Sequence, residues 1–246
     1  MDKMIYLSMT SASNAMLGQA AVASNLAHVN VPGFKADFEQ FRSMPVFGDG
    51  LPSRAYALQE RPGVDLSDGL IRQTGNPLDI AINGDGWIAV QTEYGGEAYT
   101  RRGDMQINNL GLLENGDGQL ILGNGGPIAI PPSEKLEVAV DGTISFRPAG
   151  QDEKTIAVID RIKLVNPDLN ELYKGPDGLF RMKDGSQANV DASIRVANES
   201  LEMSNVNMVG AMVDMIELSR RFEMDIKAME AAKQNDEVGT QILKMG

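Results

Sequence analysis

The sequence predicts an α+β protein, with a long helix at each end of the chain and a central, mostly antiparallel all-β domain. The residues from Leu201 to Lys244 and the first thirty residues share a helical apolar period, and the middle alternates short apolar runs with turn signals. We expect the ends to pair as a coiled-coil domain of residues 1–34 and 200–246. Residues 35–77 are expected to form an extended linker or loop region, and residues 78–199 the β-rich domain.

The C-terminal segment is predicted to be one long amphipathic helix, because a heptad grid set on Leu201 places mostly apolar residues at its core positions. The pattern fades after Met229, where Lys233 and Asp236 take core positions. The core positions predicted to form a subunit interface are Met208, Met212, Met215, Phe222, Ile226 and Met229.

The N-terminal segment repeats this spacing, with one polar interruption at Gln19. Its predicted interface residues are Ile5, Met9, Ala12, Met16, Ala23 and Leu26. From Met4 to Phe34 there is no Asp, Glu, Lys or Arg, although a helix at a water surface normally carries charges. Two interpretations stay open: the helix is buried in the core of its own chain, or it is buried between the subunits of an assembly.

The turn signals divide the rest of the chain. Val31–Phe34 contains Pro-Gly and is expected to end the first helix, because Pro disfavours a helical residue before it and Gly permits the exit turn. Pro and Gly recur from Pro45 to Gly63, which is typical of loops. From Leu78 to Ser193, short apolar runs alternate with Asn-Gly and Asp-Gly pairs, and the clearest predicted hairpin is Val138–Phe146.

Composition excludes several classes of protein. The net charge of −12 argues against a nucleic-acid partner, which requires clustered Lys and Arg. The absence of Cys excludes disulfides and thiolate metal sites. No apolar run reaches the roughly 18 residues of a membrane span, so direct membrane insertion is not expected. The start of the chain lacks the compact apolar core of a cleavable signal peptide, so any export is expected to leave this segment uncut.

Catalytic and metal-binding patterns are weak throughout the sequence. His28 is the single His, and without a second His or a Cys it is expected to have a packing role. Gly84-Asp85-Gly86 is a fragment of a glycine fingerprint, but a predicted strand follows it where a phosphate site requires a helix. The Asp-Gly turns lack the Glu that closes a calcium loop. We therefore expect no catalytic centre, no cofactor and no metal.

A longer motif resembles a known family. The segment from Thr74 to Trp87 resembles the signature of the flagellar axial rod and hook proteins. Its motif residues are Asn76, Pro77, Leu78, Asp79, Ala81, Gly84 and Gly86. Segments 19–34, 99–105, 126–131 and 201–223 resemble other parts of this family, in the same order along the chain. The opening residues 1–6 and Arg220–Glu223 favour a proximal-rod member over the distal-rod member, while Met105 and Trp87-Ile88 depart from the common pattern.

The resemblance implies a structural subunit of the bacterial flagellar basal-body rod and no enzymatic activity. Such proteins stack their terminal helices around the inside of a hollow, torque-transmitting rod, with the β domains outside, and are required for flagellum assembly and motility. It further implies a periplasmic rod location and export without a cleaved signal peptide. The implied partners are other copies of the chain, other proximal and distal rod proteins and, in transit, the flagellar type III export apparatus.

Two other functions compete with this interpretation. One is an acidic β-domain enzyme that acts on carbohydrate through paired carboxylates, but no pair of carboxylates stands out and the terminal helices would be unexplained. The other is a secreted adhesin or coiled-coil scaffold that forms a closed, small oligomer. A closed oligomer and an open rod share the heptad pattern and differ in whether assembly stops.

Overall fold

The computed structural model describes residues 4–38, 41–45, 55–59, 63–148 and 157–244 of the 246-residue chain. The chain forms two compact units. Unit 1 comprises Met1–Val29, Ala36–Leu66 and Val206–Gly246, and unit 2 comprises Asn30–Lys35 and Ser67–Asn205. The chain therefore passes between the units four times, and each unit is described by itself below.

These units group the residues differently from the predicted ranges. Residues 36–66, expected as part of a linker, belong to the unit of the helices, because strand β1 (Asp37–Phe38) pairs with β4 (Gly63–Val64) and Asn25 of helix α1 exchanges two hydrogen bonds with the backbone of Asp37. Residues 200–205 belong to the β unit, because β20 (Ser200–Glu202) pairs with β5 (Ile71–Gln73). The predicted ranges stay a prediction about which parts fold independently.

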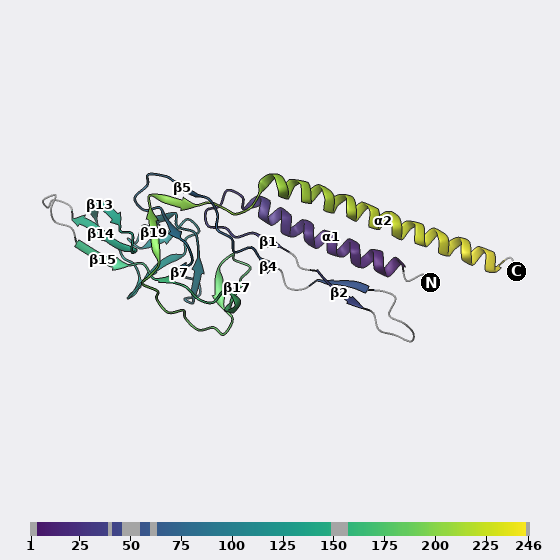
Figure 1. The fold of residues 1–246 in the computed structure, drawn as a ribbon, viewed down its shortest axis with the longest axis horizontal. Helices are drawn as coiled ribbons and strands as arrows, with labels where there is room; N and C mark the ends of the chain where they lie inside the picture. Colours follow the sequence, from purple (N-terminus) through teal and green to yellow (C-terminus); the bar gives the residue numbers. More distant parts are fainter. Residues whose placement is uncertain (1–3, 39–40, 46–54, 60–62, 149–156, 245–246) are drawn as a thin grey trace. The chain divides into compact units, whose positions relative to one another are not determined.

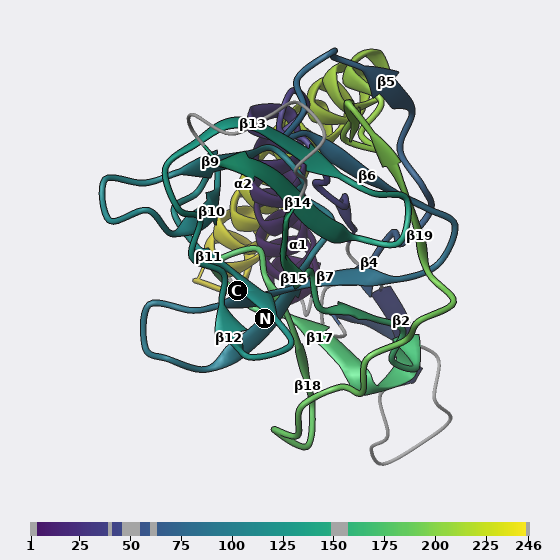
Figure 2. The ribbon, with the colours of Figure 1, turned by 90° about the vertical axis from the view of Figure 1, so that its left-hand side faces the viewer.

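Unit 1 contains two long helices, α1 (Met4–Ala27) and α2 (Met208–Lys244), which lie side by side and run in opposite directions (Figure 1 and Figure 2). The Ser11 hydroxyl donates a hydrogen bond of 2.7 Å to Asp225 Oδ2 across the pair. Helix α2 begins after Asn207, whose Oδ1 accepts a hydrogen bond from the Gly210 amide as an N-terminal cap. The unit also holds β2 (Phe41–Pro45), which pairs with β3 (Ala55–Gln59).

The residues that the two helices bury differ from the predicted core positions. At every second position, the buried residue is the one immediately before the residue that the heptad grid predicts. Helix α1 buries four small residues, and helix α2 buries or half-buries a row with alternating spacings of four and three. The α1 row is Ser8, Ala12, Ala15 and Gly18, and the α2 row is Ala211, Met215, Leu218, Phe222, Asp225, Met229 and Ala232. The small side chains of α1 permit its backbone to pack closely, which long Met side chains at the same positions would prevent.

Unit 2 is built from antiparallel strands around a nine-stranded sheet (Figure 2). The main path of this sheet runs β17 (Leu172–Lys174), β18 (Phe180–Met182), β8 (Glu97–Thr100), β7 (Trp87–Gln91), β11 (Leu120–Gly123), β10 (Leu113–Asn115) and β9 (Met105–Ile107). Two short strands join it from the side: β12 (Gly126–Pro127) pairs with β11, and β16 (Leu164–Val165) pairs with β7. A 3-10 turn at Leu169–Glu171 precedes β17.

Three further pairings complete unit 2. Strands β13 (Ser133–Val138), β14 (Thr143–Pro148) and β15 (Ala157–Arg161) form a three-stranded sheet, and β19 (Arg195–Asn198) pairs with β6 (Ile80–Asn83) alongside the β20–β5 pair. The turn between β13 and β14 places Gly142 at a φ of 83°, a left-handed conformation that glycine adopts without steric cost. The predicted hairpin at Val138–Phe146 is therefore confirmed, as is the mostly antiparallel α+β fold class.

One apolar core holds these sheets together. It joins the inward faces of the nine-stranded sheet, the β6–β19 pair and the three-stranded sheet, as shown by Ile88, Ile82 and Ile144, which are all buried. Trp87 packs against Phe180 with the ring centroids 4.4 Å apart. Because apolar burial is the dominant favourable term in folding, this cluster makes a large contribution to the stability of unit 2.

Truncating a central core residue should strongly destabilise unit 2. Ile121 is fully buried in β11, so Ile121→Ala removes apolar contacts and leaves a cavity, which should lower the free energy of unfolding by about 2–5 kcal/mol. The matched control is Val140→Ala, because Val140 is more than half exposed and its truncation should cost less than about 0.5 kcal/mol. Urea unfolding followed by Trp87 fluorescence measures both, and equal losses would contradict this core assignment.

Candidate assembly surfaces and their anchoring cluster

The family-like motif forms a hydrogen-bonded turn before β6. Asp79 is buried, and its two carboxylate oxygens accept hydrogen bonds from Asn76 Nδ2 at 2.7 Å and from the Thr74 hydroxyl at 2.6 Å. The backbone amides of Thr74 and Gly75 both donate to the carbonyl of Glu199. Glu199 has a φ of 53°, which a non-glycine residue rarely adopts, so this turn holds the chain in a strained conformation immediately before β20.

The remaining motif residues shape the start of the β6–β7 region. Pro77 is exposed, whereas Leu78 packs on the apolar core and Ala81 is fully buried in β6. Gly84 and Gly86 both have positive φ angles, of 87° and 140°. A Cβ added to Gly86 would lie 2.8 Å from the Ile194 side chain, so close packing as well as backbone conformation requires glycine there. The described contacts of the motif are thus structural.

A buried ionic cluster centred on Glu202 lies in unit 2. Glu202 Oε1 accepts hydrogen bonds from Lys35 Nζ at 2.8 Å and from the Gly69 amide at 2.9 Å, and Oε2 accepts one from Arg101 Nη1 at 3.1 Å. The side chains of Lys35, Arg101 and Glu202 are only 1%, 5% and 2% exposed. Two cations therefore surround one buried carboxylate, and the partly exposed Asp68 carboxylate lies 3.4 Å from Lys35 Nζ.

The cluster joins residues close to three of the four points at which the chain passes between the units. Lys35 ends the first segment, and its Nζ also donates to the carbonyl of Ser67, which begins the second. Glu202 lies in the last segment before α2, and its carbonyl accepts a hydrogen bond from the Gly33 amide at 2.7 Å. Sequence reasoning did not single out these charges. The signal that could have found them is that Arg101 and Glu202 both fall inside the family-like segments.

The arginine of the cluster has a second set of contacts. The Arg101 guanidinium lies 5.4 Å from the centroid of the Trp87 ring, and its Nη2 donates a hydrogen bond of 2.9 Å to the carbonyl of Gly84. Arg101 also approaches Gly33, where an added Cβ would lie 2.3 Å from the Arg101 backbone carbon. The cation–π contact and the hydrogen bond link the family-like motif to the ionic cluster.

The predicted interface residues of the helices do not form one buried set in unit 1. Met16 is 64% exposed, Met9, Ala23, Met208 and Met212 are also exposed, and Ala12 is buried. The residues Ile5, Leu26, Met215, Phe222, Ile226 and Met229 are half-buried. Their role as subunit-interface residues stays a prediction.

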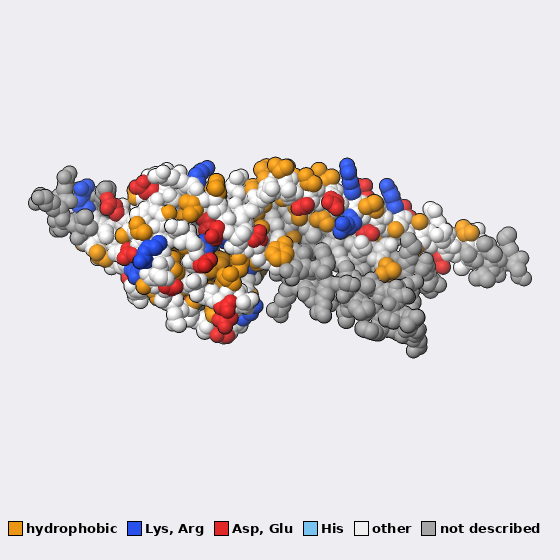
Figure 3. All heavy atoms as spheres, viewed as in Figure 1, with side chains coloured by type: hydrophobic (Ala, Val, Ile, Leu, Met, Phe, Trp, Pro, Cys, Tyr) orange, Lys and Arg blue, Asp and Glu red, His pale blue; other side chains and the backbone are white. Residues whose placement is uncertain are grey.

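The first turns of α2 carry an exposed apolar ridge. Figure 3 shows hydrophobic side chains gathered over this part of the helix. The ridge consists of Met208, Val209, Met212, Val213 and Ile216. Contiguous exposed apolar side chains of this kind mark an interaction surface more often than they occur on a free monomer surface.

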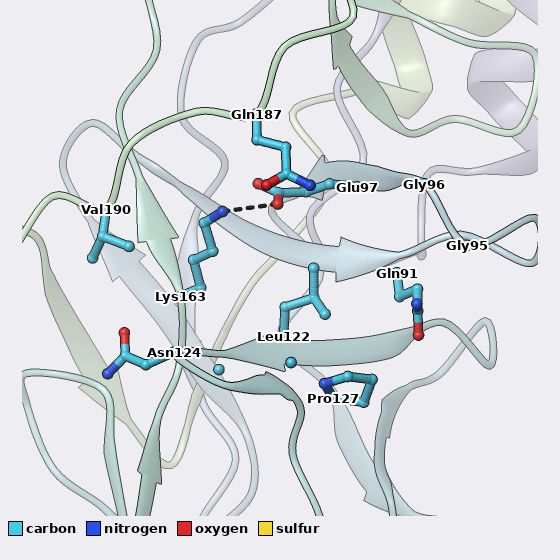
Figure 4. A pocket seen from close by; sticks show the side chains of 12 residues that line it. Gln91, Gly95, Gly96, Glu97, Leu122, Asn124, Pro127, Lys163, Gln187 and Val190 are labelled. Atoms are coloured by element: carbon cyan, nitrogen blue, oxygen red, sulfur yellow. Dashed lines mark hydrogen bonds and ion pairs between the residues drawn. The ribbon is translucent and has the colours of Figure 1, made fainter.

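A polar hollow in unit 2 is the other candidate site (Figure 4). Lys163 Nζ donates a hydrogen bond of 2.8 Å to Glu97 Oε2 at its wall, and Glu97 Oε1 has no hydrogen-bond partner among the described residues. Next to this pair on β8, burial raises the pKa of Tyr99 to about 12, and its hydroxyl accepts a hydrogen bond from the Ala188 amide. In this lining the Lys163 and Glu97 charges are paired with each other, and no Ser, Thr, Cys or His side chain is present among the described lining residues. The hollow therefore offers no combination of a nucleophile and a general base.

Comparison with known proteins defines the class of this chain. Residues 197–242 match a family described as flagellar basal body rod FlgEFG protein C-terminal, and residues 81–146 match the flagellar hook protein FlgE/F/G D1 domain. The chain is 41% identical to the flagellar basal-body rod protein FlgF of Escherichia coli strain K12 over 251 residues, which cover all of both chains. It is 40% identical to FlgF of Salmonella typhimurium, again over the full length of both.

The similarity to a second kind of flagellar rod protein is lower. The chain is 27% identical to the flagellar basal-body rod protein FlgG of Bacillus subtilis, over 95% of this chain and 96% of that protein. The two matching segments and the helical and β units define a flagellar axial protein. Within that class, the chain belongs to the FlgF family of flagellar basal-body rod proteins. It is a structural subunit of the flagellar rod, so the predicted family and the predicted structural role are confirmed.

Removing the charge at the centre of the ionic cluster should destabilise unit 2. Glu202→Gln keeps the size of the side chain but leaves the buried Lys35 and Arg101 with only the partly exposed carboxylate of Asp68, and this should lower the free energy of unfolding by about 3–5 kcal/mol. The control is Glu171→Gln, because Glu171 is exposed and should change stability by less than about 0.5 kcal/mol. Urea denaturation of both variants is the measurement. Unchanged stability of Glu202→Gln would show that the cluster does not hold these segments.

Proposed function

We propose that this chain is a proximal-rod subunit that polymerises through its terminal helices into a hollow, torque-transmitting shaft in the periplasm. The observation that carries the proposal is the outer surface of unit 1. Helix α1 has no charged residue over its whole length and still exposes Met9 and Met16 to solvent. Apolar surface gains about 25 cal/mol per Å² when it leaves water, so these faces favour contact with neighbouring subunits.

The proposed coiled-coil pairing of α1 and α2 leaves these faces free. The buried row of α2 has the alternating four-and-three spacing of a heptad seam, and Ser11 bonds to Asp225 across the pair. Met9 and Met16 of α1 lie outside this seam, and so do Met208 and Met212 of α2. Of the residues predicted as subunit contacts, these four are therefore available to helices of other subunits.

The partners we propose are other copies of this chain and other rod proteins, both proximal and distal. The relatives that carry the name FlgF match over the full length at up to 41% identity, whereas the FlgG relative of Bacillus subtilis matches at 27%, which supports a proximal-rod position. The adaptable Met side chains on both helices suit contacts with subunits of more than one type. We further propose transit through the flagellar type III export apparatus without cleavage of the N-terminal segment.

Neither helix, over the residues that the structure describes, is both long enough and apolar enough to cross a membrane. The net charge of −12 also does not favour nucleic acid. The competing function is a scaffold that forms a closed, small oligomer. A mass measurement of the assembled protein separates the two, because a rod yields a continuous series of large particles and a closed oligomer yields one defined size.

A charge on the exposed helix faces should block assembly without unfolding unit 2. Met212→Asp and Ala23→Asp both place a carboxylate on an exposed position, so the isolated subunit should tolerate them. Burying that unpaired carboxylate between subunits costs several kcal/mol, or roughly two or more orders of magnitude in association, at every repeat of the interface. The measurements are a thermal melt of the purified variant, electron microscopy of isolated basal bodies and swimming on soft agar.

The matched control is Gln234→Asp, which adds the same carboxylate to an exposed polar position of α2. This variant should build rods and swim like the unmodified protein. Normal rods and normal swimming in Met212→Asp and Ala23→Asp would contradict the proposal, since these faces would then point to solvent in the assembled state.

A further inference from the structure

Three Asn-Gly pairs occur in the sequence, at Asn83, Asn115 and Asn124. In such a pair the backbone amide of glycine is unhindered and can attack the Asn side chain, so the sequence alone makes all three equally reactive. The structure separates them. We propose that Asn124 is a site of spontaneous deamidation that converts the tip of the β11–β12 hairpin to aspartate and isoaspartate, while Asn83 and Asn115 are protected by the fold.

The Asn124-Gly125 pair is accessible and uncrowded. Together the two residues form the loop that connects β11 to β12, where Gly123 pairs with Gly126. Both are exposed, and a Cβ added to Gly125 would meet nothing within 4 Å. Figure 4 shows the Asn124 side chain beside the polar hollow, and the Asn124 backbone amide donates a long hydrogen bond of 3.4 Å to Asp160 Oδ1. The open space around Gly125 lets its amide approach the Asn124 side chain without a steric clash.

Asn115 is held in place by its own hydrogen bonds. It is fully buried, and its Oδ1 accepts from the amides of Asp117 and Gln119 at 3.1 Å and 2.9 Å. The following Gly116 packs under an ion pair, since an added Cβ would lie 2.2 Å from both Arg102 Nη2 and Asp104 Oδ2. Attack would require the side chain to leave these bonds and the glycine to move against the ion pair.

Asn83 is exposed, but its backbone is fixed on both sides. Its register partner across the β6–β19 ladder is Arg195. The carbonyl of the following Gly84 accepts a hydrogen bond of 2.9 Å from Arg101, which is itself part of the buried ionic cluster. Ring closure requires rotation about the Cα–C bond of Asn83, and this rotation would break both the ladder and the arginine contact.

The reaction needs no reagent other than water. A base in solvent takes the Gly125 amide proton, and the amide nitrogen bonds to the Asn124 Cγ. The Cγ–Nδ2 bond breaks, and ammonia leaves with a proton, which gives a five-membered succinimide. Water then opens either of its two C–N bonds, forming aspartate or isoaspartate. The overall change replaces the side-chain NH2 by OH, and because the attacking amide must lose its proton, the rate rises with pH.

The product changes the local charge and geometry. The Asn124 backbone amide donates to Asp160 Oδ1 at 3.4 Å, so a carboxylate on residue 124 adds a second negative charge close to Asp160. Isoaspartate also places an extra methylene in the backbone of a two-residue loop, which disturbs the Leu122–Pro127 pairing behind it. Asn124 is thus a slow, age-dependent modification site on unit 2.

The test compares the three pairs within one folded protein. The purified full-length chain is incubated at neutral and mildly alkaline pH, then digested and analysed by mass spectrometry, with isoaspartyl methyltransferase labelling as a second readout. We expect the Asn124 peptide to convert at least about ten times faster than the Asn83 and Asn115 peptides, which corresponds to a small difference in activation barrier. The rate should increase at the higher pH, and Asn124→Gln and Gly125→Ala should abolish or slow it.

The same incubation in urea is the control for the role of the fold. In the unfolded chain the three pairs should convert at similar rates, because their local sequences offer the same reaction. Conversion of Asn83 or Asn115 as fast as Asn124 in the folded protein would overturn the proposal. A folded Asn124 that stays intact while the unfolded one converts would overturn it as well.

Discussion

The buried pairing of Glu202 with Lys35 and Arg101 is the constraint on which the organisation of unit 2 depends. A buried carboxylate is tolerated only with cations and donors around it, so the end of the first segment, the arginine after β8 and the strand before α2 must meet at one point. The strained Glu199 lies immediately before β20, and the turn at Asp79 is joined to it by hydrogen bonds from the Thr74 and Gly75 amides to its carbonyl. Conformational strain and buried charge are thus concentrated where the chain leaves unit 2.

The sequence was sufficient to predict the α+β class, the antiparallel pairing and the hairpin at Val138–Phe146, because turn residues and apolar periodicity are local signals. It could not predict the ionic cluster, since Lys35, Arg101 and Glu202 are far apart along the chain and a single sequence carries no record of their pairing. It also missed the short strands β1 and β4, because two-residue strands leave no periodicity to detect.

For the two helices, the sequence predicted the elements but not which face of each helix is buried. Core positions of a heptad alternate between spacings of three and four residues, and the alternation can begin with either spacing. Both arrangements contain Ala12 in α1 and Met215 in α2, but they differ at every second position. The predicted grid placed Met9 and Met16 in the core, whereas the structure buries Ser8 and Ala15. Hydrophobicity alone favours the large side chain, but close packing of two helices favours the small one, and sequence periodicity cannot weigh the two against each other.

The small residues on the buried face of α1 determine which of its side chains stay exposed. Because Ser8, Ala12 and Ala15 occupy the buried face of α1, its Met side chains are directed elsewhere, on a helix without charges. Unit 1 therefore packs small residues of α1 against the row on α2 and keeps Met9 and Met16 exposed, while unit 2 buries its large apolar residues in one core. Stability and assembly consequently depend on different residues, and a rod subunit can change its neighbours by substitutions on the helices without losing the fold of its β unit.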